Sequence, residues 1–110
     1  MLQPPPSANL DLTVSAEGIH RRIDVAGELD LASAQQIDEC LTELSHDAYG
    51  AIITVDLSRL TFLDCAGLGV LVAHHYAMAA AGGQLVISRP SARAERLILL
   101  NHLEGVFEIH

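Results

Sequence analysis

The sequence from Ile52 to Val72 reads IITVDLSRLTFLDCAGLGVLV. Its first part is a β-branched apolar run that ends at Asp56, and it predicts a strand buried on both faces of a sheet. A short polar link over residues 57–61 follows. Asp64 then stands directly before an apolar segment with helical spacing, where its carboxylate can cap free backbone N–H groups. In α/β domains function usually lies at such a junction of strand, loop and helix, so this one is the candidate site.

Two strands are expected before this stretch. Residues 10–16 alternate between apolar and polar side chains, which predicts a half-exposed strand. Glu17-Gly18 is a plausible tight turn into a second strand over residues 19–26, and residues 27–31 are expected to leave the sheet. Residues 1–8 include three consecutive prolines and are expected to be a flexible leader, so that residues 9–110 form a single domain.

The segment between these strands and residue 52 predicts an amphipathic helix. Ser33 with Gln36 three residues later has the pattern of a capping box. The apolar stripe of the helix consists of Ile37, Cys40, Leu41 and Leu44. Tyr49-Gly50 is expected to close the connection to the central strand.

The helix expected over residues 65–81 contains no charged residue. It should therefore bury more than one side or present an apolar face to a partner, and self-association through it stays open. His74 and His75 are adjacent, so they point about 100° apart on a helix and cannot share a metal ion as an i, i+4 pair can. We expect both to face solvent or a partner.

Gly82-Gly83 ends that helix, and residues 84–88 predict a further core strand. Pro90 and Ser91 begin another helix, which Asn101-His102 stops, and residues 106–109 supply a last short strand. The order β-β-α-β-α-β-α-β predicts the α/β class. Its sheet would be mixed and mostly parallel, with an antiparallel N-terminal hairpin and helices packed against it.

The composition excludes several classes of function. The 110 residues include six Arg, no Lys and fourteen acidic residues, for a formal charge of −8. Such a chain has no basic stripe for nucleic acid or an anionic membrane. It has no apolar run long enough to span a bilayer and no disulfide framework, so we expect a cytoplasmic protein.

Neither cysteine is predicted to be catalytic. Cys40 lies on the apolar stripe and is expected in the core. Cys65 follows Asp64 at a helix N-terminus, which lowers a thiol pKa, but the neighbouring carboxylate acts in the opposite direction. No nucleophile–base pair, metal-ligand cluster or phosphate loop can be assembled, so we expect no enzyme activity, no metal and no cofactor.

Several segments together resemble the STAS domain family of anti-sigma factor antagonists. They are Asp56-Leu57-Ser58 with the FLDCAGLG run over residues 62–69, the Gly27-Glu28-Leu29-Asp30 quartet, the GGQLVI run over residues 82–87, and Arg96-Leu97 with residues 103–107. In phosphorylated family members a Ser or Thr follows the motif aspartate, and a second Ser usually follows it. Cys65 and Ala66 occupy those positions here.

The resemblance implies the STAS fold and a bacterial protein that binds a kinase-like anti-sigma factor and so regulates sigma-dependent transcription. It implies Cys65 as the equivalent of the phospho-acceptor and a partner-binding set of Glu28, Asp30, Leu31, Asp64, Cys65, Ala66, Gly67 and Leu68. Without a hydroxyl at residue 65, the chain would be constitutively binding-competent or redox-tuned. The alternatives are a stressosome- or transporter-type scaffold without phospho-control, or a receiver-like domain that accepts a phosphoryl group on Asp56.

Overall fold

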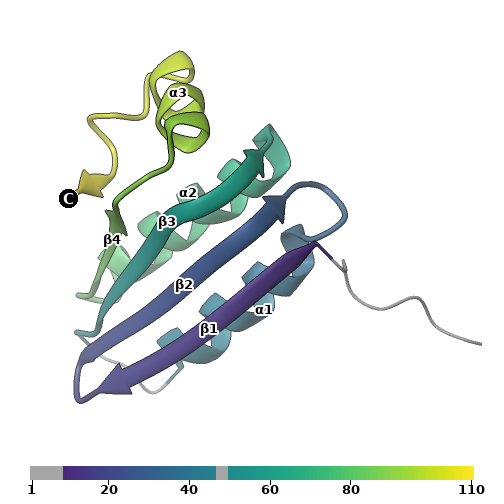
Figure 1. The fold of residues 1–110 in the computed structure, drawn as a ribbon. Coiled ribbons are helices and arrows are strands. Elements are labelled where there is room, and N and C mark those ends of the chain that lie inside the picture. Colours follow the sequence, from purple (N-terminus) through teal and green to yellow (C-terminus); the bar gives the residue numbers. More distant parts are fainter. Residues whose placement is uncertain (1–8, 47–49) are drawn as a thin grey trace, which may run out of the picture.

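The computed structural model describes residues 9–46 and 50–110 (Figure 1). The predicted leader and Tyr49 lie outside these ranges. Within them the elements follow the predicted order: β1 (Leu10–Glu17), β2 (His20–Leu29), α1 (Ala34–Ser45), β3 (Ile52–Leu63), α2 (Cys65–Ala80), β4 (Gln84–Ser88), α3 (Ala92–Leu100) and β5 (Glu108–Ile109).

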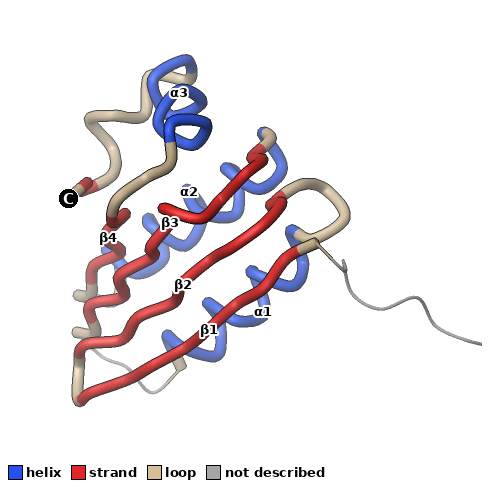
Figure 2. Tube along the Cα trace, in the orientation of Figure 1, coloured by secondary structure: helices blue, strands red, loops and turns tan. Residues whose placement is uncertain are grey.

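The strands of the described residues form one mixed sheet in the order β1-β2-β3-β4-β5 (Figure 2). β1 pairs antiparallel with β2, and the later neighbours pair in parallel. This confirms the predicted fold class. The hairpin turn lies at Gly18-Ile19 rather than at Glu17-Gly18, because Glu17 still pairs with His20.

The two central strands run further than predicted. Residues 57–61 are not a polar link but belong to β3, and Gly27 to Leu29 do not leave the sheet but belong to β2. The two extensions pair with each other as far as Leu29 and Leu63, across two register shifts. Each shift leaves one extra residue in β3. Gly27 instead allows the start of β1 to approach closely, since its φ is +99° and a Cβ there would lie 1.8 Å from the carbonyl oxygen of Asn9.

The prediction that β3 is buried on both faces is wrong. α1 and α2 cover one face of the sheet (Figure 1), where Ile53, Val55 and Leu57 are fully buried. Ile52 and Thr54 point to the opposite face and are half-buried. Within the described residues α1 and α2 leave that face uncovered, although α3 contacts the far end of β3, where Arg93 lies over Phe62.

α1 has the predicted apolar stripe, with Ile37, Leu41 and Leu44 buried and Cys40 packed at its margin. The predicted capping box is absent. Ser33 is fully buried in a helical conformation without a side-chain cap bond, and its Oγ instead donates to the carbonyl of Glu28 at 2.9 Å. The hydroxyl that the local pattern assigned to the helix cap therefore donates to a carbonyl of β2 instead.

α2 begins and ends close to the predicted residues, but its two histidines are half-buried and make contacts within the chain. His74 Nε2 lies 2.7 Å from Asp38 Oδ1 of α1, and the His74 side chain is 12% exposed. His75 packs edge-to-face on Phe107, with ring centroids 5.6 Å apart. Both side chains thus tie α2 to neighbouring segments.

Candidate functional site

The candidate site lies at the edge of the sheet where the parallel strands β2 and β3 end. Leu29 pairs with Leu63 as the last rung of the two strands. After it, β2 continues into residues 30–33, the β2–α1 loop, and β3 turns directly into α2. The sheet topology therefore brings together the two motifs of the sequence, the quartet over residues 27–30 and the run over residues 62–69.

Asp64 connects these two segments. Its Oδ1 accepts the N–H of Gly67 at 3.0 Å, which confirms the predicted helix cap. Its Oδ2 accepts the N–H of Leu31 in the β2–α1 loop at 3.2 Å. The backbone N–H of Asp64 also donates to the carbonyl of Leu29 at 3.2 Å. Asp64 is thus fixed by three contacts in addition to its place in the chain.

The β2–α1 loop is held by its own polar groups. Asp30 Oδ1 accepts the N–H groups of Ala32 at 3.0 Å and Ser33 at 3.1 Å, and the N–H of Asp30 donates to Ser33 Oγ at 3.0 Å. The N–H of Glu28 donates to the carbonyl of Asn9 at 2.8 Å. The loop is therefore ordered before any partner arrives, which lowers the entropic cost of binding.

The predicted partner-binding residues differ in their exposure to solvent. Leu31 is 79% exposed, and Cys65 is also exposed. Glu28, Asp30, Asp64 and Ala66 are half-buried. Gly67 is buried and Leu68 is 3% exposed, so these two support the surface from beneath.

Gly67 lets the first turn of α2 approach β2 closely. A Cβ on this residue would lie 2.6 Å from Leu29 Cγ and 2.8 Å from the Leu29 carbonyl oxygen. Such distances are shorter than any ordinary contact, so a larger residue would push α2 away from β2. Glycine at this position is a packing requirement of the site.

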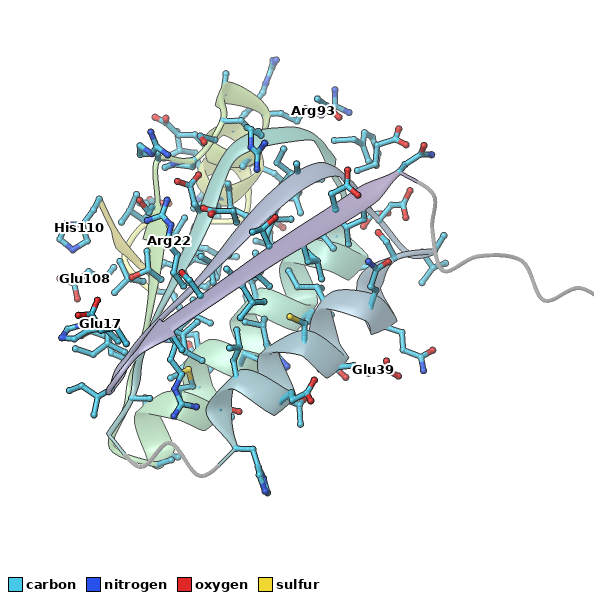
Figure 3. The ribbon with its side chains drawn as sticks, turned by 60° about the horizontal axis from the view of Figure 1, so that its bottom comes forward. Glu17, Arg22, Glu39, Arg93, Glu108 and His110 are labelled. Carbon is cyan, nitrogen blue, oxygen red and sulfur yellow. The ribbon has the colours of Figure 1, made fainter. Side chains whose placement is uncertain are left out.

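Sequence reasoning missed the participation of α3. The guanidinium of Arg93, in the first turn of α3, lies 4.7 Å from the ring centre of Phe62, in cation–π contact. Figure 3 shows Arg93 at the α3 end of the molecule. No local pattern joins two residues so far apart in the chain, so the sequence carried no signal for this contact.

Sequence reasoning also missed an ion cluster on the uncovered face of the sheet. Asp56 is 3% exposed, and its Oδ2 accepts from the guanidinium groups of Arg22 and Arg89, while its Oδ1 accepts the N–H of Ser58 at 2.8 Å. Arg22 and Glu39 lie on opposite sides of the sheet (Figure 3). Burial raises the pKa of Asp56, but hydrogen bonds from Ser58 and Arg89 outweigh burial and lower the pKa to about 2.

This shift predicts a pH-dependent stability. The folded-state pKa lies below the ordinary value of 3.8, so Asp56 stabilises the fold above pH 4 and loses this effect as pH falls towards 2. We expect the free energy of unfolding of wild type to be higher than that of Asp56→Asn. This difference should be constant above about pH 5 and should become smaller by about 2 kcal/mol at low pH. Urea unfolding of both proteins from pH 2 to 7 measures it. A margin independent of pH would contradict the assignment.

The two cysteines differ in exposure, and Cys40 is half-buried at the margin of the core rather than inside it. Burial, and secondarily the charge of Glu43, raise the pKa of the Cys40 thiol, which packs against the core. Cys65 is free and exposed at the start of α2. Among residues 9–46 and 50–110, no three His, Cys, Asp or Glu side chains are grouped to hold a metal ion. No helix of the same residues is long and apolar enough to cross a membrane.

A family model described as Mlab, STAS domain matches residues 12–108. Over 90 residues the chain is 32% identical to the anti-sigma-B factor antagonist of Listeria monocytogenes, covering 82% of this chain and 78% of that protein. It is 29% identical over 101 residues to the anti-sigma-B factor antagonist of Bacillus subtilis, covering 92% of this chain and 91% of that protein.

Solved structures agree with the fold. An anti-sigma factor antagonist from Mycobacterium paratuberculosis superposes with a TM-score of 0.82 at 23% identity, covering 99% of this chain and 90% of that one. The unphosphorylated form of the anti-sigma factor antagonist SpoIIAA gives a TM-score of 0.77 at 19% identity, covering 91% and 88%. At these identities the likeness concerns the fold.

Proposed function

Since the chain belongs to the STAS domain family, we propose that it acts as an anti-sigma factor antagonist, a bacterial protein that binds an anti-sigma factor and so frees a sigma factor for transcription. The relatives in Listeria and Bacillus carry this name, and the matches cover 78% and 91% of their lengths. The chain would act by binding alone, with no cofactor and no catalytic step of its own.

The observation that carries this proposal is the ordered, partly apolar surface at the carboxyl edge of β2 and β3. Leu31 and Cys65 project from two segments that Asp64 joins. The proposed contact surface comprises Glu28, Asp30, Leu31, Asp64, Cys65 and Ala66, supported from beneath by Gly67 and Leu68. An exposed leucine on a rigid loop is suited to enter an apolar pocket of the partner.

The proposal includes the loss of phosphate control at residue 65. A phosphoryl group adds roughly −1.5 to −2 charges and three acceptor oxygens, which disrupts a closely packed contact. Cys65 has no hydroxyl to accept it from a kinase-like anti-sigma factor. The chain would then stay competent to bind whatever the state of such a kinase.

The receiver-like alternative has little support. Asp56 would be its phosphoryl acceptor, but the carboxylate is buried and both its oxygens are occupied by Arg22, Arg89 and Ser58. A receiver needs an accessible acceptor beside acidic Mg²⁺ ligands. The binding function is therefore the one we propose.

Binding to purified anti-sigma factors from the same genome tests the proposal by calorimetry. We expect Leu31→Ser to weaken binding to the cognate factor about thirtyfold, which corresponds to the loss of about 2 kcal/mol from burial of a leucine side chain. Leu100→Ser is the matched control, because Leu100 is 67% exposed on α3, outside the proposed surface, and should leave affinity within about twofold. Equal effects of the two variants, or no binding to any anti-sigma factor, would contradict the proposal.

A further inference from the structure

The contact between Asp64 and Leu31 takes the place of a backbone hydrogen bond. In a parallel ladder one residue donates its N–H to one partner residue and accepts, at its carbonyl, the N–H two positions further on. Asp64 makes the first bond, to the Leu29 carbonyl at 3.2 Å. The second bond would join the Leu31 N–H to the Asp64 carbonyl.

That carbonyl is not free, because the chain has already turned into α2. The carbonyl oxygen of Asp64 accepts the N–H of Leu68 at 3.0 Å, as the first bond of the helix. The side-chain Oδ2 accepts the Leu31 N–H instead, at 3.2 Å. A single carboxylate therefore continues the sheet with one oxygen and caps the helix with the other.

We propose that Asp64 positions Leu31 for the partner and that a negative charge at residue 65 releases Leu31. This inference rests on the proposed function. Residue 65 is the neighbour of Asp64 at the N-terminus of α2, where an added anion is attracted to the free N–H groups of the first turn. It competes there with Asp64 Oδ1 and repels the carboxylate, so the bond from Oδ2 to Leu31 opens.

Hydrogen exchange of the Leu31 amide, followed by NMR in the isolated chain, tests the coupling. Asp64→Ser keeps a good helix cap but has no second oxygen for Leu31, so we expect the exchange of Leu31 to accelerate about tenfold. Cys65→Glu should produce a similar acceleration relative to the uncharged, equally long Cys65→Gln. In the Asp64→Ser background, Cys65→Glu should add nothing further.

Amides of the sheet core separate this role from a general loss of stability. Ile23 and Val55 should keep their exchange rates in all these variants, since a global destabilisation would accelerate them together with Leu31. Unchanged Leu31 exchange in Asp64→Ser, or equal exchange in Cys65→Glu and Cys65→Gln, would overturn the inference.

Affinity measurements complete the test. Asp64→Ser should weaken binding to the anti-sigma factor about tenfold, and Asp64→Ser combined with Leu31→Ser should bind no more weakly than Leu31→Ser alone, about thirtyfold below wild type. Independent, additive losses would overturn the positioning role. If the exchange results are as expected but no anti-sigma factor binds the wild type, the proposed function fails while the coupling between residues 65 and 31 stands.

Discussion

Replacing Gly67 with Ala is expected to lower the free energy of unfolding by about 1–2 kcal/mol, even though Ala is the better helix former. The added methyl would lie 2.6 Å from Leu29 Cγ and 2.8 Å from the Leu29 carbonyl oxygen. The side chain can turn away, but the carbonyl belongs to β2 and already accepts the Asp64 N–H. Overpacking should lower the free energy of unfolding by about 2–3 kcal/mol, and the higher helix propensity of Ala should offset about 1 kcal/mol of this loss.

Gly69→Ala is the matched control, two residues along the same helix. Gly69 is exposed, and a Cβ there would meet nothing within 4 Å. The same substitution should therefore stabilise the protein by about 0.5–1 kcal/mol through helix propensity alone. Urea unfolding of the three proteins at neutral pH measures both values. If the two variants shift stability in the same direction, the close approach of α2 to β2 is not the constraint that we describe.

Cys65→Ser is expected to change phosphorylation at residue 65 from absent to nearly stoichiometric. The frame around the position is intact, because Asp64 caps the helix, Gly67 packs against Leu29, and the side chain at residue 65 is exposed. A kinase-type anti-sigma factor would be built around a hydroxyl oxygen, which the thiol of the wild type does not supply. Ala66 stays in place, so the test concerns one acceptor alone.

Phosphopeptide mass spectrometry after incubation with Mg²⁺, ATP and an anti-sigma factor that binds the chain measures the labelling. Cys40→Ser is the control, since Cys40 is half-buried on α1 and should stay unlabelled. Labelling of wild type at Ser58 or Thr61 would mean that the switch has moved along β3 rather than disappeared. If a kinase binds Cys65→Ser without labelling residue 65, residue 65 is not the position equivalent to the phospho-acceptor.

The sequence was most informative where local chemistry decides the structure. Asp64 was recognisable as a helix cap, and the apolar stripe of α1 and the glycines after α2 marked their elements. The order of elements then implied a parallel sheet, and with it the meeting of the β2–α1 loop and the start of α2. The structure places these two segments side by side, joined by the bond from the Leu31 N–H to Asp64.

The parts that could not be predicted depend on contacts between elements rather than on local pattern. Ser58 and Arg59 have the composition of a link, but β3 continues through them because its bulged second half pairs with the end of β2. Ser33 gives its hydroxyl to Glu28 instead of to α1. The sequence likewise does not show that Asp64 reaches Leu31, because that bond requires the Asp64 carbonyl to be occupied by α2.

Residues in the first turn of α2 have two separate roles, one in packing and one at the surface. Asp64 and Gly67 face inward and specify how the helix meets the sheet, whereas the side chain of residue 65 points outward and is free of packing. Natural selection can therefore exchange serine and cysteine at residue 65 without selecting again for foldability. Under the proposed acceptor role of residue 65, a point mutation in one codon would place such a protein under kinase control or release it. Regulation in this fold can thus diverge between paralogues faster than the architecture that carries it.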